Sequence, residues 1–547
     1  MAERQSIATV DKSVLNNGSH SLFEEQYKQV APFSNADFSD MQGLLRFGYG
    51  KLTQASFLLL RIDDSVAASG WLEHTSVTTA ETQNPPPARA LQIALTVQGL
   101  KALRLPDDVI SAFSAEFISG MAGEDNRSRR LGDVGANAPD KWLWGSPDSL
   151  PDIAVLIYAE SSLFHEWQSL VESQIKNSGF TILRTLSTTD MGNIEPFGFV
   201  DGVSSPAIDW ERKRDVSGDR LTYENISMLG EFVLGYPNEY GKYTTRPLLE
   251  NSRADLPIAE DAPDLKDLGR NGTYLVMRQI DQDVHGFWQY LNEQTGRNPA
   301  HAQELAERFV GRRMSGESLL PHSPSPIEGV GPAFDDIRRN QFTFDSDPQG
   351  VTCPFGAHIR RANPRNADLP PDTPSNLLGR LSRILALNRV FNKNQVNLHG
   401  DRIASTRFHR LIRRGREYGP VLTHDQRQDP LADDEPPSGL HFICLNANIG
   451  RQFEFIQSSW LQSTTFDGLR DENDPLVGSR ETLNGCPANK FSLPANDGMR
   501  QQIQNIPRFI TVHGGAYFFL PGVRALRYIA RAYKEFVNGG CDARLLL

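Results

Sequence analysis

The sequence has few cysteines. Its 547 residues include only Cys353, Cys444, Cys486 and Cys541, which lie far apart and form no CxxC pair. Zinc knuckles and the disulfide frameworks of small secreted domains need several cysteines at short spacing. We therefore expect neither kind of site in this chain.

Long apolar runs are also missing. The longest, such as residues 153–159 (IAVLIYA), fall far short of the roughly 20 residues that a membrane helix needs and are typical of buried strands. Residues 1–20 carry acidic and polar side chains where a signal peptide would have a basic patch and an apolar core. We expect a cytoplasmic protein with no membrane partner.

Positive charge is not in excess. The formal net charge is -11 and the pI is about 5.6, whereas surfaces that bind nucleic acid or anionic membranes are basic. We therefore expect no nucleic-acid partner, and basic clusters such as residues 410–416 (RLIRRGR) must serve local purposes. The length allows two or three globular domains.

Short strand-like runs alternate with amphipathic helical patterns along the chain. The expected segments are residues 43–52 (strand), 55–64 (strand), 91–103 (strand, helix), 106–121 (helix), 152–161 (strand), 162–179 (helix), 180–187 (strand), 271–294 (strand, helix), 438–461 (strand, turn, helix) and 508–520 (strand, turn, strand). Two such series predict two α+β domains, each with an antiparallel sheet and helices to one side.

The domain boundaries follow from this pattern. We expect an N-terminal extension at 1–40, a first domain at 41–225 and a second at 226–547. Residues 207–270, rich in charge, glycine and proline, form either a connector that covers the sheets or a lid. The sequence assigns no role to residues 295–335.

Residues 351–365 (VTCPFGAHIRRANPR) combine one histidine with three arginines. A histidine beside so many cations is a poor metal ligand unless the metal complex carries anionic groups, as heme does with its two propionates. Two further stretches stand out, residues 198–202 (GFVDG) and 410–420 (RLIRRGREYGP). Each alone has a plain explanation, an Asp-Gly turn or a solvated charged face.

Taken in order, these stretches resemble the dye-decolorizing heme peroxidases, in particular their longer bacterial and fungal branch. FGFVDGVSSP matches the family's GxxDG motif, AHIRRANPR its proximal-histidine motif and LIRRGREYGP its distal-arginine segment. Supporting matches are GEFVLGYPNEYG (230–241), FEFIQSSW (453–460), DPLVG (474–478) and HGGAYFFLP (513–521). The resemblance implies two ferredoxin-like domains, with heme b held mainly by the second.

The resemblance also assigns roles in peroxide chemistry. His358 is implied as the axial iron ligand, and Asp474 is its candidate hydrogen-bond partner, with loop capping as the alternative. On the opposite side of the heme, Asp201 would move a proton between the peroxide oxygens, and Arg413 would stabilise the charge that develops. Because a carboxylate stays ionised in mild acid, we expect the peroxidase to work best below neutral pH.

Other residues are expected to hold the heme or to line its pocket. Arg360, Asn363 and Arg365 are candidate propionate ligands, and Leu440 and Phe442 would narrow the distal pocket from one face of a strand. His441, between them, is expected to face away, and Arg361 to lie on a solvated face.

A narrow pocket excludes large donors, so electrons would then arrive through side chains at the surface. Tyr418 and Trp460 are candidates for that transfer, with simple packing as the alternative for each. The predicted function is a heme b peroxidase that reduces hydrogen peroxide and oxidises dyes or phenols. The rival is a heme-binding or iron-releasing protein on the same scaffold. Oligomeric state is not predicted.

Overall fold

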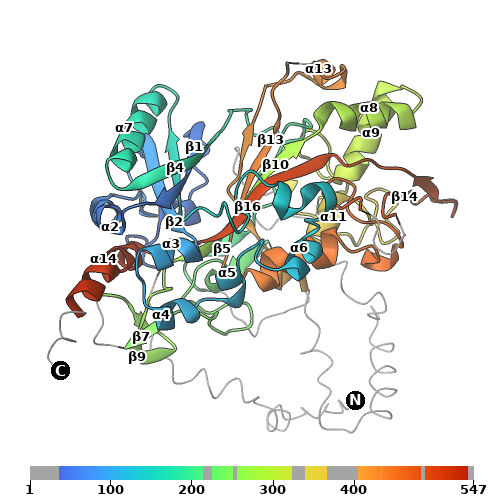
Figure 1. Cartoon of the computed structure of the whole chain (residues 1–547). Coiled ribbons are helices and arrows are strands. Elements are labelled where there is room, and N and C mark those ends of the chain that lie inside the picture. The colour runs from blue at the N-terminus through green and yellow to red at the C-terminus, as the bar shows by residue number, and fades with distance from the viewer. Residues whose placement is uncertain are drawn as a thin grey trace, which may run out of the picture.

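One antiparallel sheet runs through the middle of the molecule, with helices around it (Figure 1). The computed structural model describes residues 36–213, 225–250, 255–322, 339–365, 405–432, 434–481 and 487–539. Strands from both halves of the chain join in this sheet, which has nine strands within the described residues. The fold is α+β, as the sequence predicts.

The first half of the chain builds one end of the sheet. Its elements are β1 (Gln54–Ile62), α2 (Ser65–His74), β2 (Arg89–Leu95), β3 (Ile153–Ala159), α7 (Phe164–Lys176) and β4 (Phe180–Ser187). The strands lie in the order β2-β3-β1-β4, and the order of strands and helices along the chain is that of a ferredoxin-like unit. The Asp64 side chain starts α2 by accepting hydrogen bonds from the N–H groups of Val66 and Ala67.

Short helices fill the long connection between β2 and β3. They are α3 (Val97–Ala102), α4 (Asp107–Ser111), α5 (Ala115–Ser119), α6 (Asp125–Leu131), η2 (Gly135–Asn137) and η3 (Pro139–Lys141). The single helix expected at 106–121 is therefore two, because the Ser114 side chain accepts from the N–H of Phe117 and begins a new helix there.

The second half repeats the same arrangement. Its elements are β10 (Thr273–Gln282), α8 (Val284–Gln294), α9 (Pro299–Val310), α11 (His358–Ala362), η5 (Ser405–Phe408), β11 (Ile412–Arg413), β12 (Arg416–Tyr418), α13 (His424–Gln428), β13 (Gly439–Asn446), the π-helical turns η6 (Gly450–Glu454) and η7 (Ile456–Leu461), η8 (Phe466–Gly468), β14 (Phe491–Leu493), β15 (Gln501–Ile503), β16 (Ile510–Leu520) and α14 (Val523–Gly539). The strand order β11-β13-β10-β16, with β12 also paired to β13, matches that of the first half.

The two halves meet where β16 lies beside β2. A single residue pair, Phe519 with Leu95, joins them in the sheet. Along β1, Leu58 and Leu60 face one hydrophobic core, which includes α2, α7 and α14, whereas Phe57 and Leu59 face a second core on the other side. Both faces of this part of the sheet are therefore buried. The boundary expected near residue 225 stays a prediction.

The described parts of residues 207–270 pack against both cores: Leu249, Leu256 and Leu268 belong to the first, and residues near 229–236 belong mainly to the second. These parts comprise β5 (Ala207–Asp209), β6 (Ile226–Met228), η4 (Leu229–Glu231), β7 (Leu248–Glu250), β8 (Ile258–Ala259) and β9 (Ala262–Asp267). Leu229, Phe232, Val233 and Tyr236 are buried in the second core. This packing matches the connector interpretation rather than the lid.

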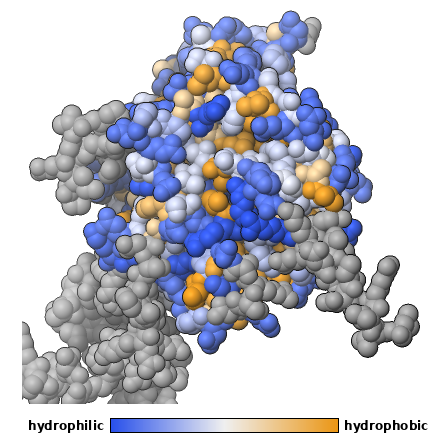
Figure 2. Space-filling view, turned by 90° about the vertical axis from the view of Figure 1, so that its left-hand side faces the viewer, coloured by the Kyte–Doolittle hydropathy of each residue, from blue (hydrophilic) through white to orange (hydrophobic). Residues whose placement is uncertain are grey.

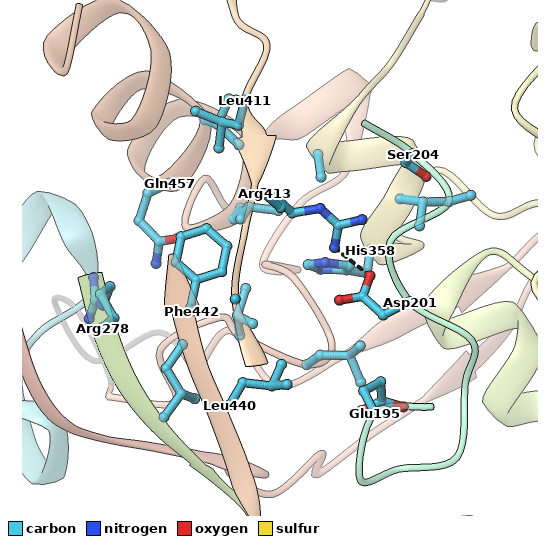
Figure 3. A pocket seen from close by; sticks show the side chains of 18 of the residues that line it. Glu195, Asp201, Ser204, Arg278, His358, Leu411, Arg413, Leu440, Phe442 and Gln457 are labelled. Carbon is cyan, nitrogen blue, oxygen red and sulfur yellow. Dashed lines mark hydrogen bonds and ion pairs between the residues drawn. The ribbon is translucent and has the colours of Figure 1, made fainter. Parts of the chain in front are cut away.

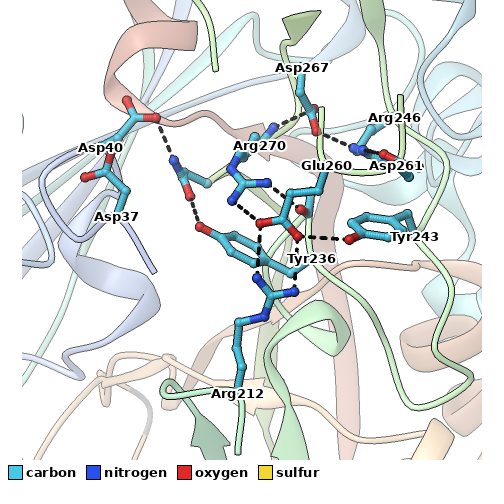
Figure 4. A network of polar contacts seen from close by, with 12 residues as sticks. Asp37, Asp40, Arg212, Tyr236, Tyr243, Arg246, Glu260, Asp261, Asp267 and Arg270 are labelled. Carbon is cyan, nitrogen blue, oxygen red and sulfur yellow. Dashed lines mark hydrogen bonds and ion pairs between the residues drawn. The ribbon is translucent and has the colours of Figure 1, made fainter. Parts of the chain in front are cut away.

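Buried ion pairs fix this connector in place (Figure 4). The Glu260 carboxylate accepts hydrogen bonds from Arg212 at 3.0 and 3.1 Å, from Arg270 at 2.7 Å and from the Tyr243 hydroxyl at 2.9 Å. Arg246 donates to Asp267 at 2.6 Å. Because each charge has an opposite partner, the network offsets the cost of burying it.

Two further local predictions are wrong. Residues 43–52 form no strand: the chain turns through η1 (Gly43–Leu45), where the Gly43 N–H donates to Thr78 O at 2.8 Å. Residues 508–520 contain one continuous strand, β16, with no turn at its glycine pair. A Cβ on Gly514 would lie 2.5 Å from the Trp144 ring, so glycine serves close packing there.

Apolar side chains on one face of the molecule occur in small separate groups among hydrophilic ones (Figure 2). Within the described residues, no helix combines the length and apolar character needed to cross a bilayer. The two described cysteines, Cys353 and Cys444, are buried free thiols, while Cys486 and Cys541 lie outside the described residues, as does most of the 1–40 extension.

Candidate active site

A cavity of about 320 Å³ is lined by residues from both halves of the chain (Figure 3). Ile280 on β10 and Leu440 and Phe442 on β13 line one side, and residues of α11 and η7 such as Ile359 and Ile456 line another. Most of its wall area is apolar, but many polar and charged residues also line it, among them Asp201, His358 and Arg413. Such a cavity is typical of a cofactor or substrate site.

Asp201 and Arg413 form an ion pair in this cavity. Arg413 Nη1 donates to Asp201 Oδ1 at 2.6 Å (Figure 3). β11 holds Arg413 beside Cys444 of β13, and the Asp201 N–H donates to Asn193 O at 2.9 Å, which fixes the loop after β4. The sheet and the loop thus bring the two charges together.

The surroundings keep Asp201 ionised. Burial alone would raise the pKa of its carboxyl, but the Arg413 charge, the Gly202 N–H, the Arg413 hydrogen bond and His358 outweigh burial and lower the pKa below its ordinary value of 3.8. At any pH above that value Asp201 is a carboxylate that is able to accept a proton.

His358 reaches the same cavity from the start of α11. Its Nδ1 lies 2.9 Å from Asp474 Oδ2, and Asp474 Oδ1 accepts from the N–H groups of Leu476 and Val477 at 2.9 Å each. Burial favours the neutral imidazole, but the Asp474 carboxylate outweighs burial and raises the pKa of His358. Asp474 thus binds His358 and caps its own loop, so the two alternatives for this residue coexist.

Glu195 is a carboxyl of the cavity wall that no sequence motif indicated. It accepts from the N–H groups of Phe197 at 3.1 Å and Phe199 at 2.9 Å, and from Gln282 Nε2 at 2.7 Å. Burial raises its pKa to about 7. These bonds fix the turn that leads to Asp201. Its place two residues before the FGFVDG stretch was the only available signal.

Basic and amide side chains gather at one part of the cavity lining. Arg365 lies 3.8 Å and Arg312 5.3 Å from the centre of the Phe342 ring, and Arg312 donates to Ser204 at 3.0 Å. The same lining includes Asn225, Asn363 and Arg410. Of the three propionate candidates, Arg365 and Asn363 therefore line the cavity. Arg312, Asn225 and Arg410 could not be recognised from the sequence, because contacts with distant parts of the chain bring them to the cavity.

Arg360 does not line the cavity, so its expected contact with a propionate is wrong. Its guanidinium is buried between the rings of Phe344 and Phe355, 4.4 Å from each centre, and donates to Cys353 O at 2.8 Å. α11 turns this side chain away from His358. It therefore supports the turn before the helix.

Arg361 was expected on a solvated face, and this prediction is also wrong. It is completely buried and donates to the backbone carbonyls of Trp460 at 2.8 Å and Glu472 at 2.6 Å. Carbonyl acceptors hold its charge in place of water. Arg361 ties α11 to η7 instead of facing solvent.

Leu440 and Phe442 share the cavity face of β13 (Figure 3). His441, between them, points the other way, where its Nε2 lies 3.0 Å from Ser187 O and its ring stacks on Tyr418. Alternation along a strand explains this arrangement.

Neither expected electron-transfer residue lies at the surface. Tyr418 is buried against His441 and donates its hydroxyl hydrogen bond to Asp281. Trp460 is buried beside His409 and Phe455, with ring centres 5.3 Å apart in each case. Apolar ring surface explains the burial. A donor in solution does not reach either ring directly.

Comparison with known proteins adds a family context. No family model matches the chain. A dye-decolorizing peroxidase of Mycetinis scorodonius is 25% identical over 92% of this chain and 90% of its own length, and one of Auricularia auricula-judae is 27% identical over 91% and 87%. This chain is a homologue of the dye-decolorizing peroxidases. A bacterial relative, the multifunctional dye peroxidase of Amycolatopsis, is 29% identical over 62% of each chain.

The solved structures agree on the fold. A crystal structure of the dye-decolorizing peroxidase of Auricularia auricula-judae covers 92% of this chain and all of its own, with a TM-score of 0.64 and 24% identity. The two ferredoxin-like halves joined in one sheet are therefore the fold of a dye-decolorizing peroxidase.

Proposed function

We propose that this protein is a heme b-dependent peroxidase, which reduces hydrogen peroxide and takes single electrons from aromatic donors such as dyes or phenols. The observation that carries the proposal is one cavity that holds both the Asp201–Arg413 ion pair and the His358–Asp474 pair. The first pair suits proton transfer and the second suits ligation of iron.

The residues of the cavity fit heme. His358 uses Nδ1 for Asp474, so Nε2 is the nitrogen that would bind iron, and the carboxylate would make the ligand more basic. Arg365, Asn363 and Arg410 would hold the anionic propionates. When bound, heme supplies a redox-active iron that takes two oxidising equivalents from peroxide and returns them one electron at a time.

Asp201 performs the proton transfer. As a carboxylate it accepts a proton from one oxygen of hydrogen peroxide and returns it to the other, so that the second oxygen leaves as water. Its lowered pKa keeps the acceptor form present in mild acid. Two donor molecules then each lose one electron and one proton, which completes a second water.

Arg413 stabilises the negative charge that develops on the leaving oxygen and holds Asp201 in position. Leu440 and Phe442 line the same cavity and would limit the access of bulk water and large donors to the reacting atoms.

Relatives support the choice of donors. The curated relatives carry the name dye-decolorizing peroxidase, and one solved structure is a complex of such an enzyme with 2,6-dimethoxyphenol. Dyes and phenols are accordingly proposed as donors here. The cytoplasmic location expected from the sequence stays a prediction.

The test is catalytic decolourisation of an anthraquinone dye by heme-loaded protein and hydrogen peroxide, with the heme spectrum recorded before and after. The proposal requires many turnovers and an unchanged heme. Release of iron-free porphyrin would instead indicate an iron-releasing protein. Heme that stays bound with no dye oxidation would indicate heme carriage.

A further inference from the structure

Among the described aromatic residues that connect to the cavity, Tyr240 is exposed. Its exposed fraction is 45%, against 9% for Tyr418 and 7% for Trp460. It lies in the stretch GEFVLGYPNEYG, to which the peroxide chemistry assigns no role. Tyrosine is one of the few side chains that give up an electron readily. The contacts of Tyr240 with rings in the protein interior therefore decide whether it can exchange electrons with the cavity.

Aromatic rings lead from Tyr240 to the cavity. Tyr240 stacks on Phe408 with ring centres 4.0 Å apart and planes 14° from parallel. The next residue, His409, lines the cavity and stacks on Phe455 at 3.7 Å. Trp460 lies 5.3 Å from both His409 and Phe455. We name these five residues the aromatic path.

Arg451 on η6 fixes the path at its middle. Its guanidinium donates to Phe408 O at 2.8 Å, and its own carbonyl oxygen pairs with His409 Nδ1 at 2.5 Å. Its charge is balanced by Glu231, with 2.9 Å between Arg451 Nη2 and a carboxylate oxygen. The two stacked pairs are thus held in one orientation by backbone contacts.

We propose that Tyr240 is the site at which aromatic donors too large for the cavity give up their electrons. This inference rests on the proposed function, because peroxide must supply the oxidising equivalents. A planar multi-ring dye contacts the exposed Tyr240 ring, and the aromatic path carries the electron to the cavity edge at His409.

For each electron transferred, Tyr240 is oxidised once and reduced once. Tyr240 loses one electron to the cavity and its hydroxyl proton to solvent, and becomes a neutral radical. A phenolic donor then gives Tyr240 one electron and one proton and leaves as the donor radical. Two such events per hydrogen peroxide yield two waters and two donor radicals.

Three variants test the site. Tyr240→Phe keeps the ring that stacks on Phe408 and removes the readily oxidised phenol, and Tyr240→Trp restores an oxidisable ring. Leu170→Ser on α7 is the control, because Leu170 has the same 45% exposed fraction but contacts no part of the aromatic path. Each heme-loaded protein is assayed with an anthraquinone dye and, separately, for its rate of reaction with hydrogen peroxide.

The inference predicts that Tyr240→Phe lowers kcat/KM for the dye about tenfold while the rate with peroxide stays within about twofold. Tyr240→Trp retains most of the dye activity, and Leu170→Ser retains all of it. A nitroso spin trap added with one equivalent of peroxide should label the wild-type peptide that carries Tyr240, as read by mass spectrometry.

Unchanged dye oxidation in Tyr240→Phe, or a spin-trap label found only elsewhere, would overturn this inference and leave the peroxidase intact. A wild-type protein that does not react with peroxide would overturn the proposed function, and this inference with it. The two failures are therefore distinguishable.

Discussion

Arg413 and Asp201 are 212 positions apart in the sequence, yet their side chains meet at 2.6 Å in the cavity. Arg413 comes from a two-residue strand at the edge of the second half, and Asp201 from the loop after the last strand of the first half. The reacting groups thus come from both halves of the chain. The site depends on the sheet that joins those halves.

Replacement of Asp201 by asparagine should slow the reaction with peroxide. The amide keeps the size of the side chain but does not accept the proton, so the rate should fall by roughly 10² to 10⁴. Stopped-flow absorbance of the heme-loaded variant measures it. Asp497→Asn, in an exposed turn, is the control and should react as the wild type does. A wild-type rate in Asp201→Asn would exclude it as the proton acceptor.

The pH dependence follows from the direction of the Asp201 shift. A lowered pKa means that the carboxylate persists as pH falls and is lost only on passing below the ordinary value of 3.8. The rate with peroxide should therefore hold from neutral pH to about pH 4 and decline below it. A rate that climbs steadily from acid to alkaline pH would contradict this assignment.

Glu195→Gln should change how stability depends on pH. Burial raises the Glu195 pKa from 4.5 to about 7, so the folded protein holds a proton that the unfolded chain releases. The stabilisation from this proton is present below pH 4.5 and is lost as pH rises to about 7. The free energy of unfolding should fall by up to roughly 3 kcal/mol over this range.

Urea unfolding of the purified full chain at pH 5 and pH 7 measures this difference. The difference in unfolding free energy between the two pH values should shrink in Glu195→Gln. It should stay unchanged in Glu166→Gln, which removes an exposed carboxylate on α7. An identical pH dependence in wild type and Glu195→Gln would show that the buried carboxyl does not titrate in this range.

Arg360 and Arg365 should differ in their effect on heme. Arg360→Met breaks buried hydrogen bonds to Cys353 O and Asp347, so it should lower stability by about 3 kcal/mol without weakening heme affinity in the folded protein. Arg365→Met, in the cavity lining, should weaken that affinity. Heme titration at low temperature separates them. A weaker affinity in Arg360→Met than in Arg365→Met would reverse the assignment.

The spacing of apolar residues along the sequence was sufficient to predict much of the fold. Residues 152–161, 180–187 and 271–294 form the strands and helix expected, because alternation and amphipathic spacing are local properties. The joining of both halves through Phe519 and Leu95 was not predictable, since a single edge pairing leaves no periodic signal. A glycine pair likewise does not reveal whether it turns the chain or makes room for Trp144.

The motifs located the cavity better than the directions of individual side chains. Asp201, His358 and Arg413 all line the cavity, and each could be found from the sequence because it stands in a long motif. Arg360 and Arg361 follow His358 within the same motif, yet both point into the protein, where carbonyl oxygens accept their hydrogen bonds. A short helix sends neighbouring residues in different directions, and sequence alone does not tell which one faces a cavity or solvent.

The most direct test of the account is the stopped-flow absorption spectrum of heme-loaded protein after one equivalent of hydrogen peroxide. We expect a histidine-ligated ferric spectrum that converts rapidly to an oxidised form and returns when a donor is added, with the ferric spectrum altered in His358→Ala. Heme that binds but never reacts with peroxide would contradict the peroxidase.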